Sequence, residues 1–234
     1  MLAITRREFS AYFSSPIAYI YLAVFYFFSG YYFYLICLYY GIADLSYVFS
    51  SLYSIVIFLI PVLTMRLFSE DIKHKTDQAL ITAPISLVSL VIGKFLSAWI
   101  VFAMGVGITM VYGLVISLFV PAGWAVIFGN VIGLLLMGGS LISIGMFISA
   151  LTENQVIAAV GGFGVSLLLM MFSSIAGMMP NQWMYELLMV LSILQRYQSF
   201  TNGQLDIAGI LFFLSVIATF IFLTVRVFDK RRWS

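Results

Sequence analysis

Charge is what this sequence has least of. Only 9% of its 234 residues are Asp, Glu, Lys or Arg, whereas 63% are hydrophobic. Soluble domains carry about 25% charged residues, so a soluble globule of this length is not expected. The apolar runs are long and continuous, unlike the short alternating segments of a transmembrane β-barrel. The composition therefore predicts an all-α polytopic membrane protein.

Reactive groups are scarce as well. The chain has one cysteine, Cys37, and one histidine, His74, and it contains neither an HExxH motif nor a His/Cys cluster. A disulfide within the chain and a metal-dependent hydrolase are therefore not expected. No GxxxxGK[ST] phosphate-binding loop is present, so ATP binding of the P-loop kind is not expected either. We expect no enzyme activity, no metal and no cofactor in this chain.

Two further classes of function are disfavoured. The apolar segments contain almost no acid or base, and ion-coupled carriers place ionisable groups in their spans. The formal net charge is only +2, and the basic residues cluster at the expected membrane edges, so no nucleic-acid partner is expected. Energy for any transport must then come from outside the bilayer.

Charged and turn-forming residues divide the chain into six expected spans. These cover residues 17–39, 48–68, 87–119, 125–150, 156–178 and 207–227. Residues 1–15 place apolar side chains on one face, which predicts an amphipathic helix at the membrane surface. Residues 180–206 are amphipathic and too short to cross between their charges. They are expected to form extracellular or re-entrant helices, one of them at residues 183–194.

The basic residues predict the orientation. With six spans, one side of the membrane receives Arg6, Arg7, Arg66, Lys73, Lys75, Lys94, Arg226, Lys230, Arg231 and Arg232. The other side receives only Arg196. By the positive-inside rule both termini and the loop after the second span are cytoplasmic. Lys94, near the start of the third span, is expected to project into water or to snorkel.

Residues 69–86 form a strongly charged loop with the signals of two short helices. Ser69, followed by two acidic residues, is a possible N-cap of the first helix, and Thr76 of the second. Ser86 is a possible N-cap of the third span. Two capped helices would form a rigid unit able to transmit force. A plain solvated loop is the alternative.

Glycine is frequent in the third, fourth and fifth spans. Gly129 and Gly133 have the small-xxx-small spacing that lets two helices approach closely. Tight packing within one subunit is the favoured interpretation, and a dimer seam is the alternative.

Several segments resemble the ABC-2 type permeases of ABC transporters, in particular the gliding-motility-type subgroup. They are MRLFSED at residues 65–71, TDQALITAP at 76–84, REF at 7–9, YFSSPI at 12–17, GKF at 93–95, LTENQ at 151–155 and GQLD at 203–206. The chain departs from the family pattern in the loop, where the usual Gly-Thr is Lys75-Thr76 and the usual Glu is Asp77.

The resemblance implies a half-transporter in the bacterial cytoplasmic membrane. Two such permeases, identical or related, would pair with two ATP-binding subunits that bind ATP and Mg²⁺. The implied contacts with those subunits are Arg6, Arg7, Arg66, Glu70, Asp71, Lys73, His74, Lys75, Asp77 and Glu153. The implied extracellular gate contains Trp183, Glu186 and Arg196. The expected function is export of a lipid-like, amphipathic or peptide substrate, and a non-transporting membrane anchor or scaffold is the alternative.

Overall fold

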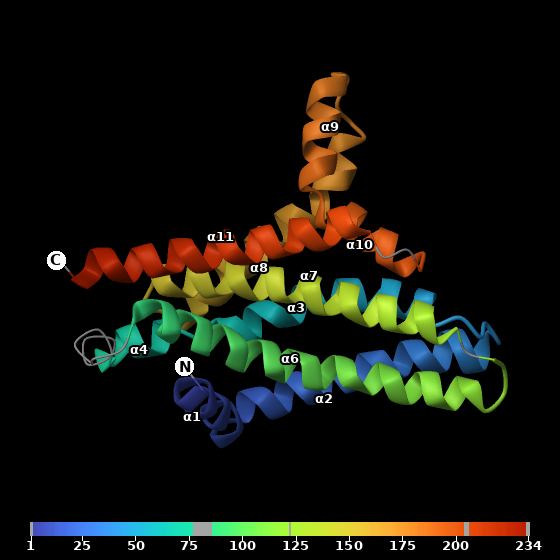
Figure 1. Ribbon diagram of the computed structural model, residues 1–234, viewed down its shortest axis with the longest axis horizontal. Helices are drawn as coiled ribbons and strands as arrows, with labels where there is room; N and C mark the ends of the chain where they lie inside the picture. Colours follow the sequence, from blue (N-terminus) through green and yellow to red (C-terminus); the bar gives the residue numbers. More distant parts are fainter. Residues whose placement is uncertain (1, 77–85, 122, 204–205, 233–234) are drawn as a thin grey trace.

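Six long apolar helices run along one bundle axis (Figure 1). The computed structural model describes residues 2–76, 86–121, 123–203 and 206–232, and within these ranges it contains helices and no strands. The span-length helices are α2 (Pro16–Phe33), which continues as the π-helix η1 (Tyr34–Tyr39), α3 (Ser46–Thr64), α6 (Leu87–Ser117), α7 (Trp124–Leu151), α8 (Gln155–Ala176) and α11 (Ile207–Arg232). The predicted all-α class, with six helices long and apolar enough to cross a membrane, is confirmed.

Four shorter helices complete the described chain. They are α1 (Leu2–Ser14), α4 (Ser69–Lys73), α9 (Gln182–Leu191) and α10 (Ile193–Thr201). The second short helix predicted in the charged loop, together with Asp77, falls in residues 77–85 and lies outside the described residues. Ser86 accepts a hydrogen bond from the Ser89 amide and caps α6 as predicted.

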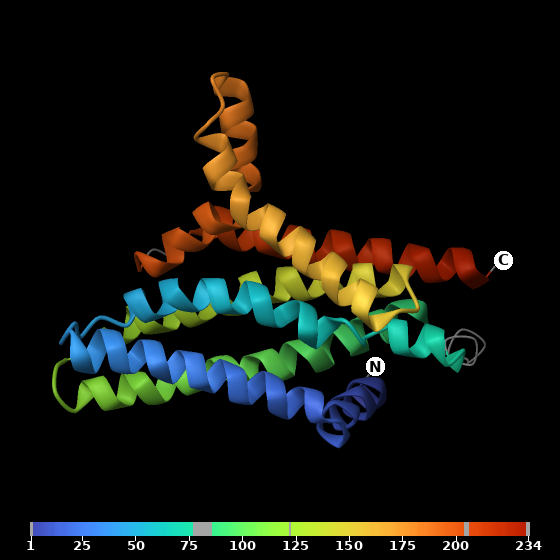
Figure 2. The same cartoon turned by 180° about the vertical axis from the view of Figure 1, so that it is seen from behind.

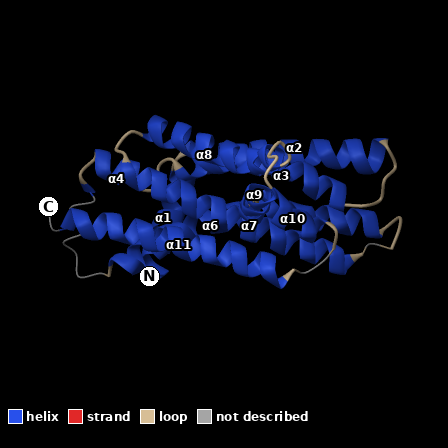
Figure 3. Ribbon diagram, turned by 90° about the horizontal axis from the view of Figure 1, so that it is seen from above, coloured by secondary structure: helices blue, strands red, loops and turns tan. Residues whose placement is uncertain are grey.

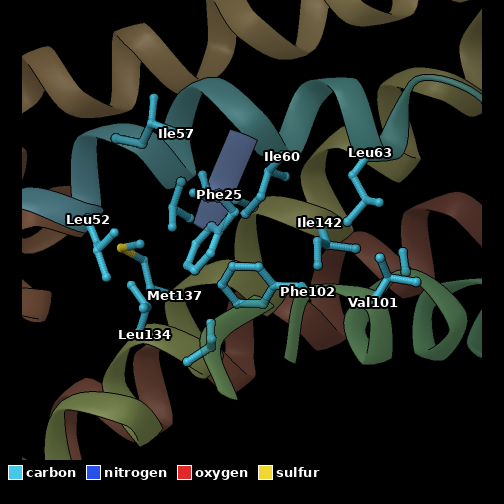
Figure 4. Packing of buried hydrophobic residues seen from close by; sticks show 14 of the residues in the cluster. Phe25, Leu52, Ile57, Ile60, Leu63, Val101, Phe102, Leu134, Met137 and Ile142 are labelled. Atoms are coloured by element: carbon cyan, nitrogen blue, oxygen red, sulfur yellow. The ribbon is translucent and has the colours of Figure 1, made fainter. Parts of the chain in front are cut away.

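Helix α7 lies at the centre of the bundle and packs against α3, α6, α8, α10 and α11. Figure 4 shows the core formed by α2, α3, α6 and α7. Its labelled side chains are Phe25, Leu52, Ile57, Ile60, Leu63, Val101, Phe102, Leu134, Met137 and Ile142. Glycines on α7 allow the close approach: a Cβ atom on Gly138 would overlap the ring of Phe102, and one on Gly145 would overlap Thr64. Small residues therefore serve packing within this chain.

Helix α9 projects from the side of the bundle, part-way along its length (Figures 1 and 2). Seen from above, it points toward the viewer over the middle of the bundle (Figure 3). A helix is predicted over residues 183–194, and the structure has α9 over Gln182–Leu191; the predicted end is wrong, because the chain breaks at Ser192. Ser192 has extended backbone angles, and its hydroxyl accepts a hydrogen bond from the Gln195 amide, so it is the N-cap of α10.

The two ends of the bundle differ in charge. Helices α1 and α4 and the C-terminal turns of α11 lie toward the same end (Figure 1), which we call the basic end. The described basic residues of α1, the α3–α4 turn, α4, the first turns of α6 and the last turns of α11 are found there. The α2–α3 loop, the α6–α7 turn and the C-terminal end of α10 lie at the opposite end (Figures 1 and 2).

Candidate functional site

A buried lysine joins three separate segments at the basic end. The Nζ atom of Lys94, on α6, lies 2.9 Å from Glu8 Oε2 of α1 and 2.7 Å from Asp71 Oδ2 of α4. Lys94 is only 2% exposed, and its ammonium group lies 5.2 Å from the ring centre of Phe68. A charge removed from water is tolerated where opposite charges compensate it. The two carboxylates therefore hold α1 and α4 to the N-terminal part of α6.

A glycine beside this lysine brings α1 close to α6. A Cβ atom added to Gly93 would lie 2.9 Å from Ile4 Cγ2, a separation too short for ordinary van der Waals contact. The absence of a side chain at Gly93 thus permits the approach that lets Glu8 reach Lys94.

Arg66 links the turn after α3 to α1. Its Nε lies 2.8 Å from Glu70 Oε2, its Nη1 donates to Ser15 Oγ, and its guanidinium carbon lies 5.8 Å from the ring centre of Tyr12. The Tyr12 hydroxyl donates to the Leu63 carbonyl oxygen at 2.9 Å. Burial raises the pKa of the Tyr12 phenol above its usual value, so the hydroxyl stays protonated and keeps this bond.

Ser149, near the end of α7, fixes the start of α4. Its Oγ accepts hydrogen bonds from the backbone amides of Phe68 and Ser69, each at 3.1 Å, and donates to the Met65 carbonyl oxygen at 3.0 Å. The first amides of a helix have no partner within the helix, so α7 supplies the cap. The prediction that Ser69 caps this helix is wrong: Ser69 is its first residue, and its hydroxyl donates back to Met65.

The C-terminal part of α11 also contacts this region. Arg231 Nη2 donates to the Ala150 carbonyl oxygen at 3.0 Å, and its guanidinium carbon lies 5.7 Å from the ring centre of Phe228. The Phe228 ring packs on Phe68, with ring centres 4.5 Å apart. Helix α4 and the residue before it, Phe68, thus contact α6, α7, α8 and α11.

A cleft of about 570 Å³ opens between α1, α4 and α6. Its charged lining contains both signs, in Arg7, Glu8, Arg66, Glu70, Asp71 and Lys94. His74 also lines the cleft and is exposed, and Lys73 and Lys75 are exposed beside it. Thr76 Oγ1 donates to Asp71 Oδ1 at 2.9 Å, which folds the end of the described loop back onto α4. Such a surface can receive charged and hydrogen-bonding groups of another protein.

The predicted coupling residues that the structure describes lie at the basic end. Arg6 and Arg7 are exposed on α1, Arg66 lies in the turn before α4, and Glu153 is exposed in the turn between α7 and α8. Glu70, Asp71 and Lys73 lie on α4, and His74 and Lys75 follow it. Asp77 lies outside the described residues.

Lys94 differs from its prediction, and the contacts of Ser149 were not predicted. Lys94 was expected in water, but it is buried, because Glu8 and Asp71 supply opposite charges that only the fold brings to it. No sequence pattern distinguishes Ser149 from other serines in the apolar helices. Such a serine usually donates to a carbonyl oxygen of its own helix, as Ser140 and Ser143 do here.

Among the described residues, no hydrogen bond or ion pair joins the three residues of the expected gate to one another. Trp183 is 68% exposed on α9, and Glu186, also on α9, accepts a hydrogen bond from Gln182 Nε2 at 3.2 Å. Arg196 belongs to α10, and its guanidinium carbon lies 5.8 Å from the ring centre of Phe212 on α11. The gate stays a prediction.

No known family model matches this chain, and no curated protein matches it either.

Proposed function

We propose that this chain is the membrane-spanning subunit of an ABC-2 type ATP-binding-cassette transporter, driven by separate ATP-binding subunits that dock at the basic end. ATP and Mg²⁺ would be bound by those subunits. The proposal starts from the seven sequence segments that resemble the family, and it takes its main structural support from Lys94. That residue joins Glu8 and Asp71, which belong to the two segments that the resemblance assigns to contact with the ATP-binding subunit.

The packing of α4 supports a mechanical role. A force on an exposed loop moves a transmembrane helix only if the loop is fixed to that helix. Helix α4 is fixed to α6 through Asp71 and Lys94 and to α7 through Ser149. Closure of ATP-binding subunits against α4 would therefore shift α6 and α7 together, because the attached side chains of these two helices, Lys94 and Ser149, are buried in the packed bundle.

The charge distribution supports the proposed orientation. The basic end carries nearly all the described lysines and arginines, and the other end carries none on the α2–α3 loop or the α6–α7 turn. By the positive-inside rule the basic end faces the cytoplasm of a bacterial inner membrane, where ATP-binding subunits are found. Both termini would then be cytoplasmic, and α1 would lie along the inner membrane surface.

A second permease subunit, identical or related, is part of the proposal because of α9. If the bundle axis follows the membrane normal, α9 points sideways at membrane depth (Figure 2), with Gln182 and Glu186 exposed. A carboxylate in hydrocarbon costs about 2.5–3.5 kcal/mol on insertion scales. A second subunit packed on α8 and α9 would remove this cost, and it would cover exposed apolar residues of α8 such as Val160 and Leu168.

The substrate would be lipid-like, amphipathic or a peptide. The outward face of α8, which a partner would cover, is apolar, for example at Val156, Val160 and Leu168, and such a face suits an amphipathic passenger. Movement of the spans would open an outward path, so export is the proposed direction.

A membrane anchor or scaffold that docks a cytoplasmic protein without transport is the second candidate. The same basic-end cleft favours it, since a docking surface alone does not require transport. Stimulation of ATP hydrolysis distinguishes the two candidates.

The test is reconstitution of this chain with candidate ATP-binding-cassette subunits from the same genome. The pair should copurify, and its ATPase rate in liposomes should respond to the permease. Lys73→Glu reverses an exposed charge on α4 and should weaken binding of the ATP-binding subunit by about tenfold, since like charges placed across an interface repel. Lys73 lies on the docking surface, and its reversal leaves the Lys94 contacts intact.

Arg226→Glu is the matched control, because Arg226 is also an exposed basic residue but lies on α11 and does not line the cleft. It should leave binding unchanged. Equal effects of the two reversals would contradict docking at α4. Firm binding without any change in ATPase rate or in transport would favour the scaffold.

A further inference from the structure

A second pocket lies at the end of the bundle opposite α1 and α4. Its volume is about 540 Å³. It is formed where the α2–α3 loop and the start of α3 meet the end of α6, the start of α7 and the end of α10, and Figures 1 and 2 show these segments together at that end. The pocket and the basic-end cleft lie at opposite ends of the bundle. The proposed coupling mechanism does not involve the pocket.

The pocket contains a buried hydrogen-bond acceptor that has no partner among the described residues. Asn130, on α7, lines the pocket and is 0% exposed. Its Nδ2 donates to the Val126 carbonyl oxygen at 2.9 Å. Since a carbonyl oxygen can only accept, this bond fixes the orientation of the amide and leaves Oδ1 without a donor. Buried polar atoms are normally satisfied, so an unpartnered one in a pocket wall indicates a missing donor.

The charge of the pocket points to the kind of donor. Asp44 is the one charged side chain among the described residues that line it. Asp44 Oδ1 accepts from the Ser46 amide at 2.9 Å, and none of the described lining residues is basic. Arg196, the basic residue of α10, lies against Phe212 and is not part of the lining. A donor that also carries positive charge therefore fits best.

The rest of the lining adds an apolar wall. Leu45, Ile116 and Ile127 are buried hydrophobic residues that line the pocket, and Ser46 and Ser50 are polar residues in its lining. A wall of this kind suits a ligand with an apolar body attached to its charged head.

We propose that this pocket binds the ammonium group of an amphipathic primary amine, with Asn130 Oδ1 accepting a hydrogen bond from it and Asp44 supplying the opposite charge. The amine could be a soluble molecule or the headgroup of an aminophospholipid, because both present the same N–H donors. The proposal does not depend on ATP-driven coupling.

The test compares three probes of equal chain length by calorimetry on the full-length protein in phosphatidylcholine nanodiscs. Octylamine has both charge and N–H donors, octyltrimethylammonium has charge without donors, and 1-octanol has a neutral donor. Octylamine should bind saturably, and the other two at least about tenfold more weakly, as expected for losing a hydrogen bond to a charged group or the charge itself. Empty nanodiscs correct for partitioning into lipid.

Two variants separate the contributions of the hydrogen bond and of the opposite charge to octylamine binding. Asn130→Leu should weaken octylamine binding by about tenfold or more and leave octyltrimethylammonium binding unchanged. It also removes an unsatisfied buried polar atom, so the variant should fold. Asp44→Asn should weaken binding by about threefold at low salt and less at high salt, because exposed charges are screened. Asp206→Asn is the control, since Asp206 precedes α11 and does not line the pocket.

Nanodiscs of phosphatidylethanolamine distinguish the two sources of the amine. Competition with octylamine there identifies a lipid headgroup as the occupant, and an unchanged octylamine affinity identifies a soluble amine. Equal affinity for octylamine and octyltrimethylammonium, unaltered binding to Asn130→Leu, or no saturable binding of octylamine would each overturn the proposal.

Discussion

Lys94 illustrates how much of a site depends on residues that are distant in sequence. The side chain of a lysine in an apolar run is expected to extend so that its ammonium group stays in water. Here it is satisfied by Glu8, 86 residues earlier in the chain, and by Asp71 on α4. Neither partner can be paired with Lys94 from sequence alone, because no local spacing connects the three. The family resemblance identified the segments involved, but it did not identify the ion pairs.

Lys94→Met should destabilise the protein by about 3 kcal/mol, because it leaves two carboxylates facing each other without their cation. The measurement is the midpoint of thermal or denaturant unfolding in detergent. Glu8 and Asp71 are partly exposed, with side-chain exposures of 14% and 19%. The loss of stability should therefore lie at the lower end of the range of about 3–5 kcal/mol for breaking a buried ion pair.

The neutral triple variant Glu8→Gln, Asp71→Asn, Lys94→Met is the informative comparison. It removes all three charges and should recover much of the lost stability, since no charge is then left unpaired. Lys73→Met, on the exposed side of α4, should be close to neutral. A triple variant no more stable than Lys94→Met would show that the ion pairs are not the cause.

At the scale of helices, the sequence predicts where helices begin and end if charged or turn-forming residues interrupt the apolar runs. It predicts these bounds poorly where no such residues occur. The six span-length helices are confirmed because Pro121 and Gly123, Glu153 with Asn154, and the charged loop each separate two apolar runs. The break between α9 and α10 was missed because it depends on Ser192 alone, and serine is compatible with either a helix interior or an N-cap.

Glycine packing on α7 can be tested by adding a single methyl group. Gly138→Ala should destabilise the protein by about 1–3 kcal/mol, because its Cβ would overlap the ring of Phe102 in a filled core. Gly107→Ala on α6 is the matched control, since nothing lies within 4 Å of its added Cβ. Alanine also favours helix over glycine, so the control should be neutral or slightly stabilised. Equal melting temperatures for the two variants would argue against this packing.

At the scale of the whole molecule, the charge distribution predicts an orientation, and the fold gives it a clear axis. The basic residues of α1, α4, α6 and α11, which are scattered in sequence, gather at one end (Figure 1). The sideways position of α9, by contrast, has no sequence signal. Its amphipathic pattern predicts a helix at an interface, but amphipathicity does not specify the direction of that helix relative to the bundle.

The orientation can be measured with single cysteines in a Cys37→Ser background. A membrane-impermeant maleimide applied to intact spheroplasts should label Asp44→Cys and Asn202→Cys, which are exposed at the end opposite the termini. It should label Lys73→Cys and Asn154→Cys only after the membrane is opened, because these positions are exposed at the basic end. Labelling of Lys73→Cys from outside an intact membrane would reverse the assigned topology, and with it the proposed docking of a cytoplasmic ATPase.

The backbone at Lys75 bears on how the proposed docking surface would recognise a partner. Its φ of 56° is the one positive value among the described non-glycine residues, at the position where the resembling family has glycine. A side chain in this left-handed region costs about 1–2 kcal/mol. If the chain has the proposed function, the exposed ammonium group on this corner would lie on the docking surface, where it would help to distinguish one ATP-binding subunit from another.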